Sequence, residues 1–116
     1  MLSAKVSAAL NKQIEMEGSS SQYYLAMASW AETQSLNGVS AFLYTHTDEE
    51  RMHMLKLVKF INERGGVAII PYVEKPPIEF SSLENVFKSL LDHELMVTAS
   101  INNLVDICLQ EKDYTT

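Results

Sequence analysis

Glu50 and His53 are the residues whose types and spacing most clearly suggest chemistry. They stand three residues apart in a long helical pattern, so both lie on one side of a helix. The other positions of that side, at steps of three or four, are Val39, Leu43, His46, Leu57 and Phe60. Because a buried, unpaired carboxylate costs several kcal/mol or must become neutral, such a stripe needs a compensating partner. A metal ion is the simplest candidate.

The same pattern occurs in two further segments, each an apolar stripe with one glutamate. The first stripe is Val6, Leu10, Ile14, Glu17, Ser21, Tyr24 and Ala28, and the last is Leu83, Phe87, Leu90, Glu94, Val97, Ile101, Leu104 and Cys108. Di-iron bundles combine single glutamates with Glu-x-x-His motifs from facing helices. Fe(II) accepts carboxylate oxygen and imidazole nitrogen. The stripes therefore predict an all-α bundle with an internal metal site.

Three long helices must position these residues. The pattern predicts helices over about residues 3–34, 39–64 and 82–111, with Ser3 and Ser82 as N-caps. Asn37-Gly38 predicts the turn between the first two, and Gly65-Gly66 predicts the end of the second. A short turn between long helices indicates an antiparallel hairpin.

Residues 67–80 predict a different kind of segment, because Pro71, Pro76 and Pro77 exclude a continuous helix. About 14 extended residues can span more than ~40 Å, which is the length of the helices beside them. We therefore expect a crossover that makes the third helix parallel to the second. After it, Asp113 to Thr116 predicts a turn or a new N-cap, and we expect a fourth helix to follow Thr116.

Composition narrows the class of protein. A chain of 116 residues predicts a single domain over residues 1–116. The formal net charge of −6 argues against nucleic acid and suits a protein that attracts cations. The single cysteine, Cys108, excludes an internal disulfide, and we expect it to be buried. Neither a secretory signal nor an apolar run of membrane-spanning length is evident, so we expect a cytoplasmic protein without membrane contact.

In order and spacing, several segments together resemble the non-haem bacterial ferritins along the whole chain. The matching segments are residues 10–13 with Glu17, residues 20–24, residues 42–46, residues 49–53, residues 93–94 and residues 112–114. The resemblance implies a ferritin-like four-helix bundle, of which the first three long helices and the crossover are present. It also implies iron storage by a homo-oligomer, a hollow cage of about 24 subunits, that oxidises Fe(II) with O2 or peroxide.

The resemblance also implies roles for individual residues. Glu17, Glu50 and His53 match the ligands of a first iron, and Glu50 would bridge to a second iron that Glu94 also binds. Tyr24 matches a tyrosine that hydrogen-bonds at this site and can donate an electron. Glu49 matches an additional, weaker iron position.

Three further residues bear on which metal or cofactor the chain could bind. His46 could form a zinc site with Glu50 and His53, although a hydrogen-bonded core histidine is favoured. We expect His93 to point away from the site, towards the surface or an interface. Haem-binding relatives have a methionine directly after the bridging glutamate, and Arg51 occupies that position, so we expect no haem.

Two other functions fit the same helices. One is another di-iron protein, such as a rubrerythrin-like peroxidase, which would need a Cys-x-x-Cys module that one cysteine cannot supply. The other is a metal-free structural helical module with buried ion pairs, which predicts no iron uptake.

Overall fold

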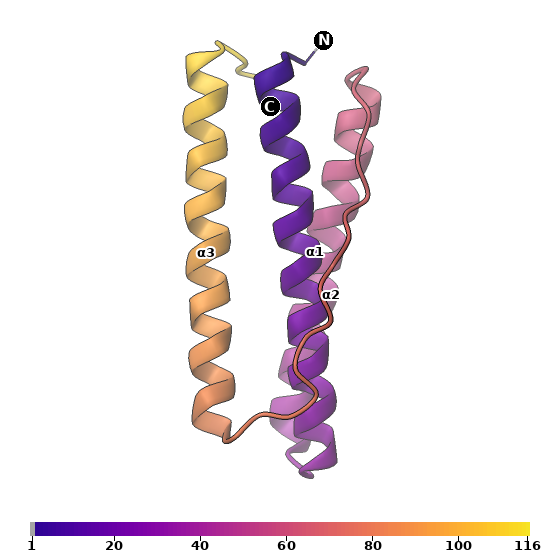
Figure 1. Cartoon of the computed structure of the whole chain (residues 1–116), viewed down its shortest axis with the longest axis vertical. Coiled ribbons are helices and arrows are strands. Elements are labelled where there is room, and N and C mark those ends of the chain that lie inside the picture. The colour runs from indigo at the N-terminus through magenta and orange to yellow at the C-terminus, as the bar shows by residue number, and fades with distance from the viewer. Residues whose placement is uncertain (1) are drawn as a thin grey trace.

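The computed structural model describes residues 2–116 and consists of three long helices (Figure 1). α1 spans Ala4–Thr33, α2 spans Asn37–Glu63 and α3 spans Leu83–Gln110. No strand occurs within residues 2–116, and none of these helices is long and apolar enough to cross a membrane. The prediction of an all-α fold with three long helices is confirmed, and every predicted helix end lies within two residues of the observed one.

Serine caps begin two of the helices, as the sequence predicts. The Ser3 hydroxyl accepts a hydrogen bond from the backbone N–H of Val6 at 3.1 Å. The Ser82 hydroxyl accepts one from the N–H of Asn85, also at 3.1 Å. Each bond satisfies one of the backbone donors that have no partner within the first helical turn.

The turn between α1 and α2 lies earlier than predicted. Asn37 and Gly38 are already helical, and the chain reverses at Ser35, which has a positive φ of 59°. The N–H of Leu36 then bonds the carbonyl of Ala31 at 3.0 Å, so the reversal is complete before Asn37. At the other end of α2 the prediction is confirmed. Gly65 adopts a φ of +83°, which glycine tolerates without steric cost, and closes the helix.

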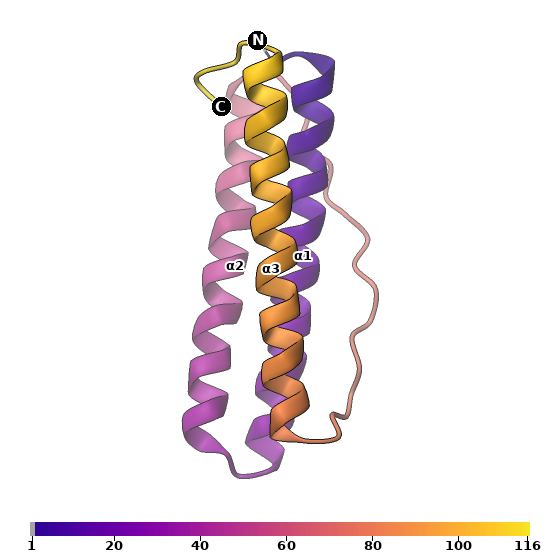
Figure 2. The ribbon, with the colours of Figure 1, turned by 90° about the vertical axis from the view of Figure 1, so that its left-hand side faces the viewer.

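The crossover between α2 and α3 runs the length of the bundle beside α1 (Figures 1 and 2). It therefore makes α3 parallel to α2, as predicted. Asn11 of α1 binds the first part of the crossover through two hydrogen bonds. Its side chain accepts one from the N–H of Ile69 at 2.8 Å and donates one to the carbonyl of Val67 at 3.3 Å.

Gly18 lies on α1 at a point that side chains of both the crossover and α2 approach closely. A Cβ atom there would lie 3.1 Å from the sulfur of Met54 and 3.7 Å from side-chain atoms of Pro71 and Val73. The close approach explains a glycine in the middle of a helix, where it costs about 1 kcal/mol relative to alanine.

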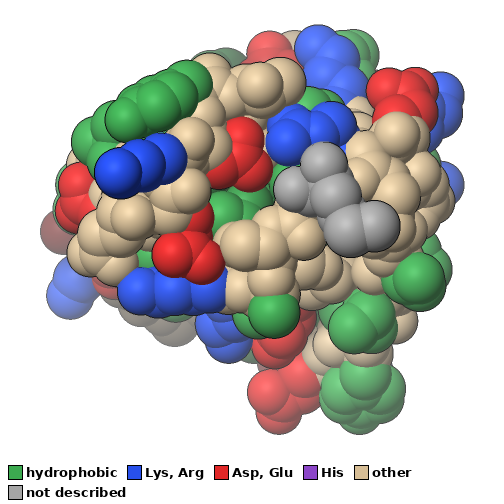
Figure 3. All heavy atoms as spheres, turned by 90° about the horizontal axis from the view of Figure 1, so that it is seen from above, with side chains coloured by type: hydrophobic (Ala, Val, Ile, Leu, Met, Phe, Trp, Pro, Cys, Tyr) green, Lys and Arg blue, Asp and Glu red, His purple; other side chains and the backbone are tan. Residues whose placement is uncertain are grey.

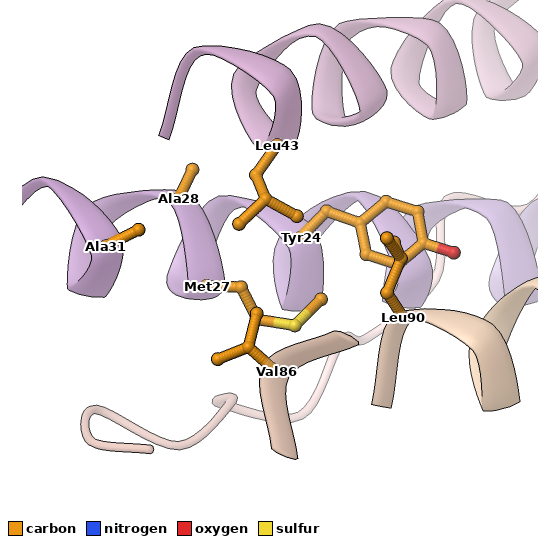
Figure 4. Close-up of a cluster of buried hydrophobic side chains, with 7 residues drawn as sticks. All are labelled: Tyr24, Met27, Ala28, Ala31, Leu43, Val86 and Leu90. Carbon is orange, nitrogen blue, oxygen red and sulfur yellow. The ribbon is translucent and has the colours of Figure 1, made fainter. Parts of the chain in front are cut away.

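The apolar core is centred on α1. In one of its two clusters, Leu43 of α2 and Val86 and Leu90 of α3 point towards Tyr24 and Met27 of α1 (Figure 4). The second cluster lies nearer the chain ends and includes Cys108, whose predicted burial is confirmed.

α2 and α3 both pack against α1 but are separated from each other. No Cα atom of α2 lies within 8 Å of one in α3. Side chains cross the gap: the rings of Phe42 and Phe87 have centroids 6.4 Å apart. Phe87 and Ile101, which the stripe of α3 predicts to be buried, are 40% and 42% exposed, because packing on α1 does not cover them.

An ion pair links the ends of α2 and α3 at the end of the bundle that also holds the start of α1. The guanidinium of Arg64 lies 3.6 Å from the carboxylate of Asp113, which also accepts hydrogen bonds from the N–H groups of Thr115 and Thr116. These hydrogen bonds hold the pKa of Asp113 below its usual value. Acidic and basic side chains are interspersed across this end (Figure 3).

Candidate metal centre

Glu17 of α1 and Glu50 and His53 of α2 converge midway along the bundle. Each offers a ligand atom, and these atoms all lie within 4.8 Å of one another. Glu17 and Glu50 are buried, at 2% and 5% exposure, whereas His53 is exposed at the rim. The helical hairpin alone therefore brings together three of the predicted ligands.

Each of the two buried carboxylates has an oxygen without a hydrogen-bond partner. Glu17 Oε1 accepts a hydrogen bond from the amide of Gln13 at 3.0 Å. Glu17 Oε2 lies 3.9 Å from Nδ1 of His53, beyond hydrogen-bond distance. Neither Glu17 Oε2 nor Glu50 Oε2 has a partner among the described residues. Since buried polar atoms are almost always paired, these two oxygens and the imidazole suit a cation.

The raised pKa of Glu50 also indicates a site that suits a cation. Burial, reinforced by hydrogen bonding and charge repulsion with Glu17, raises the pKa of Glu50 to about 9. The negative charges of Glu94 and Glu49 raise the pKa further. At neutral pH the metal-free pair therefore retains a proton, because two adjacent buried carboxylates cannot both ionise cheaply. A divalent cation would replace that proton.

Glu94 of α3 lies outside the group formed by Glu17, Glu50 and His53. Its Oε1 accepts a hydrogen bond from the hydroxyl of Tyr24 at 3.0 Å and lies 3.5 Å from Nδ1 of His46. Burial, followed by the charge and hydrogen bond of Glu94, raises the pKa of Tyr24 far above its usual value. Tyr24 therefore remains protonated and donates to Glu94. His46 is partly buried beside Glu94, and its role as a core histidine stays a prediction.

Two other residues named from the sequence, Glu49 and His93, are not members of the group. Glu49 is exposed, and its relation to Glu50 is electrostatic. His93 is half-buried, with its ring centroid 4.3 Å from that of Tyr23 and 5.9 Å from that of Tyr24. His93 packs between these rings because α3 lies against α1 there, and burial lowers its pKa.

Sequence reasoning missed two residues that contact the site indirectly. Gln13 is 2% exposed and donates to Glu17, and Ser100 of α3 donates its hydroxyl to Gln13 Oε1 at 2.5 Å. Gln13 could have been found, because a glutamine four residues before a glutamate on a helix is well placed for a hydrogen bond. Ser100 carries no comparable signal.

A sequence model of the ferritin-like domain matches residues 7–116. The chain belongs to the ferritin-like family. It is 41% identical to a probable bacterial non-heme ferritin-like protein of Haemophilus influenzae over 115 residues, which cover 99% of this chain and 70% of that protein. It is also 41% identical to the bacterial non-heme ferritin of Campylobacter jejuni, covering 100% of this chain and 70% of the relative.

Solved structures agree with this ferritin-like assignment. A ferritin of Chlorobium tepidum superposes with a TM-score of 0.94 at 43% identity, covering 99% of this chain and 71% of that one. An open-pore ferritin of Archaeoglobus fulgidus gives a TM-score of 0.93 at 39% identity, over 98% of this chain and 70% of that one. The resemblance to ferritins and the ferritin-like fold predicted from the sequence are confirmed.

Proposed function

We propose that this ferritin-like chain stores iron and oxidises Fe(II) to Fe(III) at the Glu17, Glu50 and His53 group. Fe(II) is the substrate. Glu17, Glu50 and His53 would hold a first iron, and Glu50 would also contact a second iron, which Glu94 would bind. Two irons held together can each give up one electron, which supplies the two electrons that one molecule of O2 or peroxide accepts. Carboxylate oxygens favour the Fe(III) product.

The chain's other residues support this chemistry. The Glu17 and Glu50 side chains are buried and the Gln13 amide holds Glu17, so less ordering is needed on binding. The Tyr24 hydroxyl holds Glu94 by a hydrogen bond near the centre. Glu94 would turn from this position to bind the second iron. Glu49 is exposed directly before Glu50 on α2 and would bind an additional iron more weakly. Tyr24 could also donate an electron.

The convergence of two buried, incompletely paired carboxylates with an imidazole carries the proposal. The test is aerobic addition of Fe(II), followed by the ultraviolet absorbance of Fe(III) products. We expect Glu50→Gln to abolish most of the fast phase. Glu63→Gln, an exposed glutamate at the end of the same helix, is the matched control and should behave as the wild type. Equal rates for Glu50→Gln and wild type would leave the metal-free structural module as the better explanation.

We also propose that copies of this chain assemble into a cage in the cytoplasm, where the oxidised iron is stored. Large apolar side chains of the crossover are exposed, and they would be covered by a neighbouring copy. They are Val67, Ile69, Ile70, Tyr72 and Ile78. Sedimentation of wild type and of an Ile70→Asp, Tyr72→Asp double variant tests this assembly. A variant that sediments as the wild type does would rule out this face.

A further inference from the structure

A hydrogen-bonded chain connects α3 to the buried ligand of α1. The Ser100 hydroxyl donates to Gln13 Oε1 at 2.5 Å, and Gln13 Nε2 donates to Glu17 Oε1 at 3.0 Å. Gln13 and Glu17 are both 2% exposed, and Ser100 is partly buried. Water therefore has little access to the amide, and its orientation is decided by its two protein partners.

The orientation of this amide follows from the chemistry of its partners. A carboxylate only accepts hydrogen bonds, so the Gln13 side chain must present its NH2 group to Glu17. That leaves the amide oxygen facing α3, where Ser100 supplies the hydroxyl donor. Glu17 thus fixes which way the amide faces, and the Ser100 hydroxyl, which can donate or accept, holds the oxygen end of the amide.

The consequence for Glu17 is that its two oxygens are distinguished. Oε1 is occupied by Gln13, whereas Oε2 is left without a partner on the side of His53, whose Nδ1 lies 3.9 Å away. Without Gln13, the carboxylate could rotate, and either oxygen could turn away from the group. Hydrogen bonds of this kind behind a ligand commonly fix its orientation and its affinity for metal.

We propose that Gln13 and Ser100 are positioning residues, which hold Glu17 with one oxygen directed at the metal position. This inference rests on the proposed metal-binding function of Glu17, Glu50 and His53. It assigns α3 a second role besides Glu94. Through Ser100 and Gln13, the docking of α3 on α1 is transmitted to Glu17.

The test measures affinity for Zn2+, a redox-inert ion that accepts the same oxygen and nitrogen ligands, by isothermal titration of the full chain. Gln13→Leu removes both polar atoms at similar volume, and we expect it to weaken binding by about 10- to 100-fold. Gln22→Leu makes the same change at an exposed position of α1 and should leave affinity unchanged.

The pair Ser100→Ala and Ser100→Thr keeps the test decisive if Gln13→Leu does not fold. We expect Ser100→Ala to weaken Zn2+ binding by about three- to tenfold, the effect of one neutral hydrogen bond. Ser100→Thr retains the hydroxyl and should restore the wild-type affinity. The d–d spectrum of bound Co2+ should shift in Ser100→Ala and not in Ser100→Thr, because only the former releases the ligand.

Two results separate failure of this inference from failure of the proposed function. If wild type binds Zn2+ no better than Glu17→Gln does, the metal-binding function itself is wrong. If wild type binds and Glu17→Gln does not, but Ser100→Ala and Gln13→Leu lower only the melting temperature at unchanged affinity, the two residues are structural. The positioning role would then be overturned.

Discussion

α2 and α3 pack on α1 in different ways, and the candidate metal centre takes residues from both the α1–α2 side and the α3 side. The α1–α2 side is closed: Glu17, Leu43 and Glu50 are each at most 5% exposed. The α3 side is open, and the side chain of Glu94 is 40% exposed. Apolar residues along α3, among them Leu91, Leu95 and Met96, are more than half exposed. The hairpin thus supplies a fixed half of the site, and α3 supplies an adjustable half.

Polar contacts compensate for the looser packing of α3. Tyr24 holds Glu94, and Gln13 holds Ser100, each across the α1–α3 interface. On the α1–α2 side, Ser21 and Ser40 donate to backbone carbonyls of the opposite helix at 3.1 and 3.0 Å, and Tyr44 donates to the carboxylate of Glu32 at 2.8 Å. Side-chain pairs specify position without requiring tight apolar packing, which suits a helix that brings a movable ligand.

The sharpest contrast between the two sides should be in stability. Leu43→Ala removes a fully buried side chain from the closed side, and we expect it to lower the free energy of unfolding by about 3 kcal/mol. Leu91→Ala, the same change at a residue that is 58% exposed, should cost less than about 0.5 kcal/mol. Urea denaturation measures both. Equal losses would show that α3 is packed as tightly as α2.

The two sides should also differ in their effect on metal chemistry. Glu50→Ala removes a buried ligand that would contact both irons, so we expect the initial rate of iron oxidation to fall by about 100-fold, or ~2.7 kcal/mol. Glu94→Ala removes a ligand of one iron, and its rate should fall by less. Stopped-flow absorbance compares the two variants. A larger effect at Glu94 would reverse the assignment of the fixed and adjustable halves.

The pKa of Glu50 predicts a pH dependence that is specific to the metal-free protein. Because the folded-state pKa is raised to about 9, the contribution of Glu50 to stability is full below its unfolded value of 4.5. It is lost progressively as the pH rises from there through about 9. Glu50→Gln cannot ionise, so at pH 8 we expect it to be more stable than wild type.

Chemical denaturation of the metal-free proteins at pH 5 and pH 8 tests this pH dependence. The advantage of Glu50→Gln should nearly vanish at pH 5, where Glu50 is protonated in the folded protein. Saturating Zn2+ should reverse the order at pH 8, because only wild type retains the ligand. An advantage that is the same at both pH values would mean that ionisation of Glu50 is not its cause.

The smallest effect is expected at His46, which contacts Glu94 from α2. His46→Ala should slow iron oxidation by no more than about threefold, because Tyr24 still holds Glu94 by a hydrogen bond. The same stopped-flow assay measures it, with Glu94→Ala as the reference. A loss as large as that of Glu94→Ala would instead make His46 a ligand, as the zinc alternative supposes.

The sequence predicts the hairpin half of this site better than the α3 half. On α1 every member of the stripe with Glu17 is buried, so the prediction is confirmed there. On α2 only Leu43 and Glu50 of the predicted stripe are buried, and His53 is exposed. On α3, Phe87 and Ile101 belong to the predicted stripe and yet are exposed. Periodicity identifies the apolar side of a helix, but it does not say how much of that side a neighbour covers. The hydrogen bond from Ser100 to Gln13 depends on the distance between helices, which no spacing along the chain encodes.

The packing at Gly18 has a consequence for hydrogen exchange. A glycine in the middle of a 30-residue helix would ordinarily mark the turn that opens first. Here Met54, Pro71 and Val73 cover Gly18, so the crossover stabilises the helical turn that also carries Glu17. The amides around Gly18 should therefore exchange through the same rare openings as the rest of α1 rather than by local fraying. The crossover, which has no regular secondary structure, thus helps to keep Glu17 in its position.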